Sequence, residues 1–185
     1  MRYFLSAATR ARCAILAQHN FDSWGELMNT VIERARVSVQ ELLACWPTLR
    51  SYEQKAQYAH DLVEMHLHEE NPERIDECIK LYAENAVWEA PARAQIYTGR
   101  RTIREMYLRI FAGTTDFSFE RLDSYATPTR VFVDMWAKFK LVGDAFDNCP
   151  FPTGTRVKMR LLHSFHIRDG LIEREIGYEI WLHDK

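Results

Sequence analysis

Two periods of apolar residues divide the chain. Up to about residue 83, apolar side chains recur at three- and four-residue steps, which is the period of amphipathic helices. From Phe117 onward, apolar and polar residues alternate, which is the period of strands with one buried face. Helices followed by a run of antiparallel strands predict an α+β fold.

The helical half carries recognisable start and stop signals. A first helix is expected over residues 7–18, and a second begins after the cap residues Asp22 and Ser23 and ends at Trp46 before Pro47. A third is expected over 52–69, with either Met65 or His66 turned inward. Asn71 and Pro72 predict a fourth, whose expected buried residues are Ile75, Cys78, Ile79 and Tyr82.

Strands dominate the second half. A short strand over 86–90 and a helix over 102–112 precede strands that begin near Phe117 and extend over 131–141, 156–167 and 171–182. Asp169-Gly170 is a strong hairpin signal between the last two strands. If such a sheet curves, helices on its concave side leave a cone-shaped, mostly apolar cavity, which is the usual form of a small-molecule site.

Composition and charge exclude several classes of protein. The 185 residues carry 24 basic against 26 acidic side chains, and this balance argues against nucleic-acid binding. The start of the chain lacks a signal-peptide pattern, and no run approaches the roughly 18 apolar residues of a membrane span. We therefore expect a cytoplasmic protein with no membrane partner. The cysteines and histidines lack zinc spacing, and His66 and His68 stand two apart on a helix, so we expect no metal.

Four stretches in the same order resemble the nuclear transport factor 2-like superfamily, and within it the SnoaL-like cyclase and isomerase group. They are Arg74–Tyr82 running into 86–91, Tyr97-Thr98-Gly99-Arg100, Pro152-x-Gly154 before His163-Ser164-Phe165, and the Asp169-Gly170 hairpin. The third also resembles the phenazine-biosynthesis A/B proteins. The resemblance spans about 60–181, which predicts an N-terminal helical extension over 1–55 and a cone domain over 56–185.

This resemblance implies a curved antiparallel sheet with helices on its concave face, and a homodimer formed through the outer sheet face at Phe132 and Trp136. It does not supply a catalytic set. The acidic position on the last strand of epoxide hydrolase-like and phenazine members falls at Gly177, and the middle-strand pair falls near Met135 and Ala137. The ketosteroid-isomerase set has no clear counterpart either.

Candidate chemistry therefore rests on His163, Glu175 and Glu179. His163 shares a face with Met159 and Leu161, where burial disfavours its charged form and leaves it a neutral base, or else a core histidine with an ordinary partner. Alternation alone turns the isoleucines of the last strand inward and its acids to solvent, which is the favoured reading because ionised acids are rarely buried unpaired. The family register instead turns Glu175, Gly177 and Glu179 inward, and a bulge at Gly177 would reconcile the two.

We expect the pocket to bind a small hydrophobic molecule. Its expected lining residues are Trp88, Tyr97, Tyr107, Met135, Met159, Leu161 and Tyr178. The segment over 142–153 is expected to be a mobile loop at the cavity mouth. The leading hypothesis is a cofactor-free isomerase, cyclase or lyase-like enzyme that uses His163 with Glu175 or Glu179. The alternative is a non-catalytic module of the same fold that binds a hydrophobic ligand or dimerises.

Overall fold

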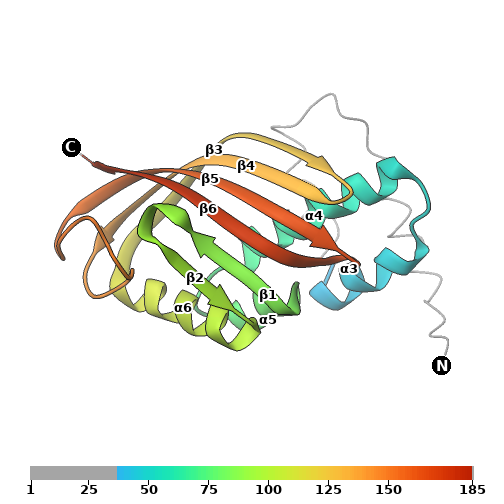
Figure 1. Ribbon diagram of the computed structural model, residues 1–185, viewed down its shortest axis with the longest axis horizontal. Coiled ribbons are helices and arrows are strands. Elements are labelled where there is room, and N and C mark those ends of the chain that lie inside the picture. Colours follow the sequence, from blue (N-terminus) through green and yellow to red (C-terminus); the bar gives the residue numbers. More distant parts are fainter. Residues whose placement is uncertain (1–36, 185) are drawn as a thin grey trace.

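A single curved sheet of six strands forms one layer of the molecule, and helices cover its concave face (Figure 1). The computed structural model describes residues 37–184. The spatial order of the strands is β2-β1-β6-β5-β4-β3, with β1 parallel to β6 and every other neighbouring pair antiparallel. The strands are β1 (Tyr82–Ala90), β2 (Gln95–Thr98), β3 (Thr114–Thr127), β4 (Arg130–Leu141), β5 (Arg156–Arg168) and β6 (Leu171–His183).

The helices come from the first part of the chain and from the connection between β2 and β3. They are α3 (Val39–Cys45), α4 (Tyr52–Glu69), α5 (Ile75–Lys80) and α6 (Arg100–Gly113), with the 3-10 turns η1 (Trp46–Thr48) and η2 (Pro91–Arg93). No helix within residues 37–184 is long and apolar enough to cross a membrane. The expected helix over 7–18 lies outside the described residues.

Helix α4 confirms the prediction for residues 52–69. Ser51 caps its first turn, and the Gln54 side chain returns the hydrogen bond to the Ser51 backbone. Its buried side chains include Ala59, Leu62 and His66, three to four residues apart, which gives the helix one face toward the sheet. That face carries a histidine into the core.

Helix α5 is shorter than predicted. The Asn71 side chain accepts a hydrogen bond of 3.1 Å from the Arg74 backbone N–H, and the helix begins only at Ile75. The expectation that Tyr82 lies on this helix is wrong, because Tyr82 is already extended and pairs with Ile172 of β6. The strand predicted over 86–90 therefore starts four residues earlier, and it brings the Tyr82 side chain inside.

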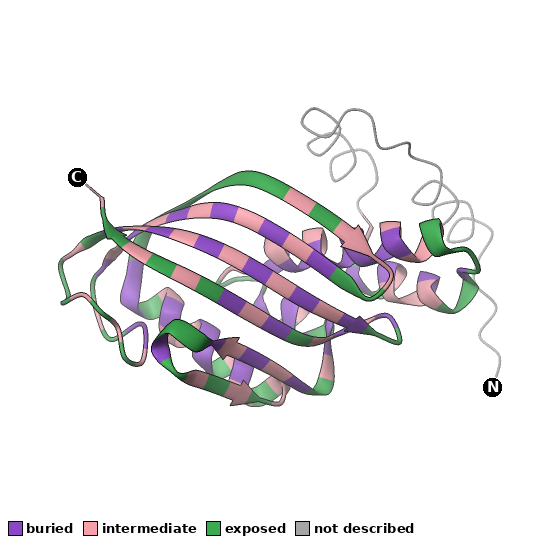
Figure 2. Cartoon of the chain, turned by 45° about the horizontal axis from the view of Figure 1, so that its top comes forward, coloured by how far each residue is buried: buried purple, intermediate pink, exposed green. Residues whose placement is uncertain are grey.

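The alternation of β4 and β5 is confirmed in full. Every second residue of these strands is buried, from Val131 to Leu141 and from Val157 to Ile167 (Figure 2). Val39, Leu42 and Leu49, which precede the predicted cone domain, belong to the same buried cluster as these strands. The segment over 39–49 therefore contributes to the core over the sheet.

Strand β6 contains an extra residue that decides which of its side chains face inward. Ile172 pairs with Ile167, but the next pair joins Arg174 to His166, so Glu173 is inserted into the ladder. The predicted bulge at Gly177 is wrong, since the register shift lies at Glu173. Its consequence is that Ile172 and Glu175, three residues apart, are both fully buried.

The Asp169-Gly170 hairpin is confirmed, and both residues have positive φ, at 51° and 77°. The Tyr58 hydroxyl donates a 2.8 Å hydrogen bond to the Gly170 carbonyl, and Trp46 packs on the glycine. A Cβ added at Gly170 would lie 2.5 Å from Cγ of Trp46. The hairpin is thus joined to η1 and α4 by a contact that only glycine permits.

We expect Gly170→Ala to lower the free energy of unfolding by about 3 kcal/mol, because it combines backbone strain at positive φ with overpacking against Trp46. The matched control is Gly154→Ala, since Gly154 also has a positive φ of 95° but open space where its Cβ would lie. Its expected cost is only about 1 kcal/mol. Urea unfolding measures both, and equal losses would contradict the packing argument.

Candidate functional site

The centre of the inner sheet face holds a carboxylate. Glu175 of β6 is 0% exposed. Its side chain accepts hydrogen bonds from two tyrosine hydroxyls, Tyr82 at the start of β1 and Tyr107 of α6, the latter at 3.3 Å to each oxygen. Burial and the adjacent carboxylate raise the pKa of both tyrosines well above the ordinary value, so both hydroxyls remain protonated donors.

Two imidazoles lie on either side of this carboxylate. Nε2 of His163 is 3.5 Å from Oε1 of Glu175, and Nε2 of His66 is 3.7 Å from Oε2. His163 comes from β5, and His66 comes from the last turn of α4. Glu175 and the four side chains around it therefore come from five different elements of the fold.

Gly177 makes room for His163. The two residues are paired across β5 and β6. A Cβ at position 177 would lie 3.6 Å from Nε2 of His163, in ordinary van der Waals contact. Anything larger would meet the ring that lies over the glycine. The inner position at which relatives in the resembled family carry an acid is therefore covered here by an imidazole, with the acid two residues away on the same face.

Burial shifts the pKa values of Glu175 and His163 in opposite directions. It raises the pKa of the Glu175 carboxyl, although the nearby His66 acts in the opposite direction. Burial, assisted by the charge of His66, lowers the pKa of His163 to about 3. This shift favours a neutral imidazole at neutral pH, which is one of the two expectations for a histidine on this face.

Three polar atoms on the inner side of the sheet lack a hydrogen-bond partner within the described part of the chain. They are Nδ1 of His163, the indole Nε1 of Trp88 and Nε2 of His66, and all three side chains are buried. Trp88 and His163 belong to strands that flank β6, whereas Nε2 of His66 lies within ion-pair distance of Glu70 and Glu175. Buried polar atoms without protein partners are uncommon, and each calls for an explanation such as strain, a bound water or ligand, or a catalytic role.

The structure brings most of the predicted pocket residues to this face. Met135, Met159, Leu161, Tyr107 and Trp88 are buried there. Tyr97 packs on Trp88 with ring centroids 5.8 Å apart. Tyr178 is the exception, because it does not lie on this face.

Tyr178 lies on the outer face and is 47% exposed, because the bulge at Glu173 turns Glu175, Gly177 and Glu179 inward. The structure does not bring it to the site. The reading that placed the acids of β6 in solvent is accordingly wrong for Glu175 and Glu179, whose side chains are buried. It fits Glu173, whose side chain is 37% exposed.

Glu179 is held in a buried ion pair. Nε and Nη2 of Arg93 donate to its two oxygens at 2.8 and 3.0 Å, and the Trp181 indole donates a third hydrogen bond at 2.9 Å. The Arg93 guanidinium also faces the rings of Trp88 and Phe146. These contacts occupy the oxygens of Glu179, which leaves Glu175 as the carboxylate better placed to act with His163.

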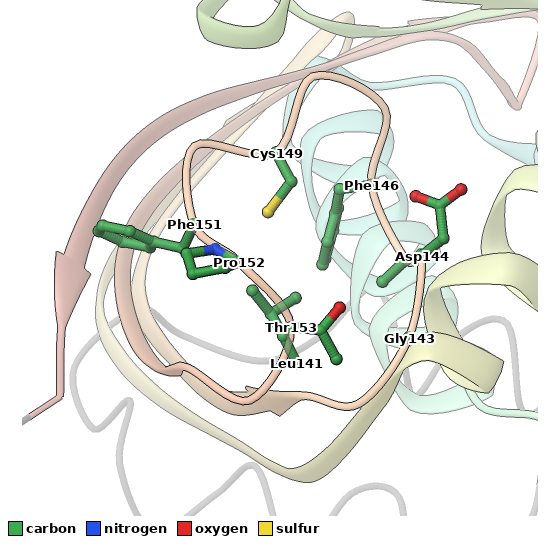
Figure 3. Close-up of a pocket in the computed structure, with 9 residues that line it drawn as sticks. Leu141, Gly143, Asp144, Phe146, Cys149, Phe151, Pro152 and Thr153 are labelled. Carbon is green, nitrogen blue, oxygen red and sulfur yellow. The ribbon is translucent and has the colours of Figure 1, made fainter.

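A second polar network holds the connection between β4 and β5. Asp147 accepts hydrogen bonds from Arg109 at 2.8 and 2.7 Å and from the Tyr97 hydroxyl at 2.5 Å, and its backbone carbonyl accepts one from Arg93 at 2.9 Å. The connection encloses a pocket of about 220 Å³ into which Phe146 and Cys149 project (Figure 3). The segment predicted to be a mobile loop is thus tied to β2, η2 and α6.

Sequence reasoning missed several members of these networks. It places Tyr82 on a helix, and it gives no signal for Arg93, whose partner Glu179 is 86 residues away, or for Arg109. It treats His66 as one of two residues able to face inward and as unsuited to bind metal with His68. The spacing of His66 and Glu70, four apart on α4, was the available signal, and their side chains lie 3.3 Å apart.

The outer sheet face carries the predicted dimer residues. Phe132 stacks on Tyr125 with centroids 5.4 Å apart, and Trp136 lies beneath Lys158 and Arg160. Tyr178 and Ile180 of β6 are exposed on the same face. Pairing of two copies through this face remains a prediction.

We expect Arg93→Met to lower the free energy of unfolding by about 3–5 kcal/mol, because it leaves the buried Glu179 charge without its partner. Arg109→Met is the control, since it removes an ion pair to Asp147 in which each side chain is more than one-third exposed. That loss should stay below about 1 kcal/mol. Urea unfolding checks both, and similar losses of stability in the two variants would refute the argument that the buried ion pair matters more than the exposed one.

The low pKa of His163 predicts a pH dependence of stability. The unfolded chain binds a proton at His163 below about pH 6.5, whereas the folded chain does so only near pH 3. Within that window acid favours unfolding, so the wild type should lose about 1.4 kcal/mol per pH unit relative to His163→Gln as pH falls. Urea unfolding of both proteins at about pH 7, 6, 5 and 4 measures this difference. His68→Gln, at an exposed position of α4, is the control, and parallel curves for wild type and His163→Gln would contradict the prediction.

Comparisons with known proteins identify the family. Residues 61–175 match the model of the SnoaL-like domain. None of the curated protein sequences matches the chain. Among solved structures, an LEH-like epoxide hydrolase of M. tuberculosis is 17% identical, with 68% of this chain and 85% of that chain covered and a TM-score of 0.55.

Two further structures have the same fold. The epoxide hydrolase/cyclase-like enzyme SalBIII, which acts in pyran ring formation in the polyether salinomycin, is 20% identical over 67% of this chain and 92% of its own, with a TM-score of 0.55. An NTF2-like protein of Burkholderia xenovorans LB400 is 15% identical over 68% and 91%, with a TM-score of 0.56. These likenesses confirm the predicted cone fold, and the family match covers more than half of the residues. The chain belongs to the SnoaL-like domain family.

Proposed function

We propose that this protein is a cofactor-free acid–base enzyme that acts on a small hydrophobic carbonyl compound. The observation that carries the proposal is the arrangement of His163 against Glu175. A carboxylate 3.5 Å from Nε2 favours the tautomer with its proton on that nitrogen, and it leaves the lone pair on the unpartnered Nδ1. The same logic orients the histidine in carboxylate–histidine pairs of other enzymes.

In this proposal, Nδ1 of His163 removes a proton from the carbon next to the substrate carbonyl. The electron pair of the broken C–H bond moves into the carbonyl to form an enolate. The Trp88 indole N–H donates to the enolate oxygen, and the imidazolium is stabilised by Glu175. In a substrate with a carbon–carbon double bond next to that carbon, the enolate is a dienolate, and return of the proton to its far end completes an isomerisation without gain or loss of atoms.

The low pKa of His163 restricts the substrate. A weak base transfers protons efficiently only from carbon acids that are themselves fairly acidic, since the proton-transfer driving force depends on both partners. Activated carbonyl compounds meet this condition. Examples are β-dicarbonyl compounds and ketones in which the carbon next to the carbonyl is bonded to an aromatic ring. The buried methionine, leucine and aromatic side chains of the inner face suit their apolar bodies.

A second candidate function is binding of a hydrophobic ligand without conversion. Met135 and Ala137 on the middle strand support it, because both are buried and apolar where the resembled epoxide hydrolases carry a polar pair. The two candidates differ in a single measurable respect, which is the movement of a proton.

The test is hydrogen–deuterium exchange of carbonyl probes in D₂O, followed by NMR. With 2-tetralone, 2-indanone and a cyclic β-keto ester as probes, we expect the protein to accelerate exchange next to the carbonyl. The change His163→Gln should reduce that acceleration by about 100-fold or more, because it removes the base.

The control is His166→Gln, which alters the same strand on its opposite face and should leave exchange unchanged. Unfolding curves of both variants should show that they remain folded. Binding of the probes with no accelerated exchange would overturn the enzyme proposal in favour of the ligand-binding module.

A further inference from the structure

The Glu175 carboxylate needs a compensating charge. An ionised carboxylate without solvent access is unstable unless it is paired, and the two tyrosine hydroxyls that donate to it are neutral. Within residues 37–184, the basic groups within ion-pair distance of it are the imidazoles of His66 and His163. One of these two rings must carry the charge if Glu175 is to orient the other.

The surroundings of His66 favour a cation. It lies in the last turn of α4, where the carbonyl end of the helix dipole attracts positive charge. Nε2 of His66 lies 3.3 Å from Oε2 of Glu70 on its own helix and 3.7 Å from Oε2 of Glu175. The ring is thus placed between two carboxylates.

The remaining neighbours of His66 are neutral. From α5, the Cys78 sulfur lies 3.2 Å from Nδ1, and burial raises the pKa of this thiol, which keeps it protonated. From β1 and α6, Tyr82 and Tyr107 face the ring at 5.4 and 6.2 Å between centroids. From β5, Phe165 contacts its edge at 5.3 Å. Burial opposes the charged form of His66, but the Cys78 sulfur at Nδ1, followed by the carboxylates of Glu175 and Glu70, outweighs burial and raises the pKa of His66 well above the ordinary value.

His163 has the opposite surroundings. It contacts a single carboxylate, lies edge-on to Phe165 at 5.4 Å, and packs over Gly177. A charge on His66 also repels a proton from His163, because both rings lie against the same carboxyl group. The two histidines therefore divide their roles, with one charged and the other neutral.

We propose that His66 is the positioning residue of this site: as an imidazolium between Glu70 and Glu175, it keeps Glu175 ionised, and this fixes His163 as a neutral imidazole with its proton on Nε2. The inference rests on the proposed function, because a positioning role for His66 requires that His163 act as the base. Its geometry and its test are independent of any substrate. The residue acts through Glu175 and does not itself touch the substrate.

The first experiment is a pH titration of the full-length chain labelled with ¹⁵N-histidine, followed by long-range ¹H–¹⁵N NMR from about pH 5 to about pH 9. We expect the two ring nitrogens of His66 to show the imidazolium pattern at about pH 8, and those of His163 to show the neutral form protonated on Nε2 throughout. A neutral His66 at about pH 7 would overturn the proposal. This measurement requires no variant, so it does not depend on whether a substitution folds.

The second experiment tests the link to Glu175. In His66→Gln protein with ¹³C-carboxyl-labelled glutamate, we expect a new infrared band of a protonated carboxyl at about pH 7, which is absent from the wild type and is lost again when Glu175→Gln is added. The control His68→Gln changes an exposed histidine of the same helix and should produce no such band. A His66→Gln protein that is folded but shows no protonated Glu175 would also refute the proposal.

The two proposals fail separately. If no carbonyl probe exchanges its hydrogen while His66 is charged, the enzyme proposal fails and the assignment of charges stands. If exchange depends on His163 while His66 is neutral, the acid–base function stands and the positioning role of His66 is refuted.

Discussion

A carboxylate without contact with solvent, at the centre of a mostly apolar sheet face, is the constraint on which this structure depends. Four elements place a polar side chain against Glu175: β1 and α6 each contribute a tyrosine, and α4 and β5 each contribute a histidine. An unpaired charge in such a place costs several kcal/mol, so each of these elements must lie where its polar group can reach the same point. The network therefore fixes how the helices sit on the sheet, beyond what apolar packing alone specifies.

The inserted residue at Glu173 is what makes this arrangement possible. Without it, the alternation that buries Ile172 would continue to Arg174 and Ile176, and Glu175 would point to solvent. With it, Ile172 closes the core near the hairpin, while Glu175, Gly177 and Glu179 share the inner face. A single extra residue thus converts an ordinary amphipathic strand into one that carries two buried acids. Both have partners: Glu175 two tyrosines and two imidazoles, and Glu179 the guanidinium of Arg93.

The elements that were predictable from sequence are those whose pattern is local. Helix α4 has a cap and a regular stripe, β4 and β5 alternate without interruption, and Asp169-Gly170 forms its turn from its own two residues. The inner face of β6 was not predictable in the same way, because both of its faces carry residues able to be buried and the bulge has no local signature. The family register identified the correct face. Partners such as Arg93 and Glu179, or Tyr82 and Glu175, are joined only by the folded chain.

The relation between Gly177 and Glu175 concerns the position at which the inner face of β6 carries its acid. The strand period of two residues means that a carboxylate moved from position 177 to 175 stays on the inner face and shifts by roughly 7 Å along the strand. The space over the glycine is then available to His163, whose ring lies across it. Met135 and Ala137 are buried and apolar, so the middle strand offers no polar partner to an acid at position 177. Acid, base and counter-charge therefore form one compact group around Glu175, and in our proposal its chemistry is set by which of two imidazoles holds the proton.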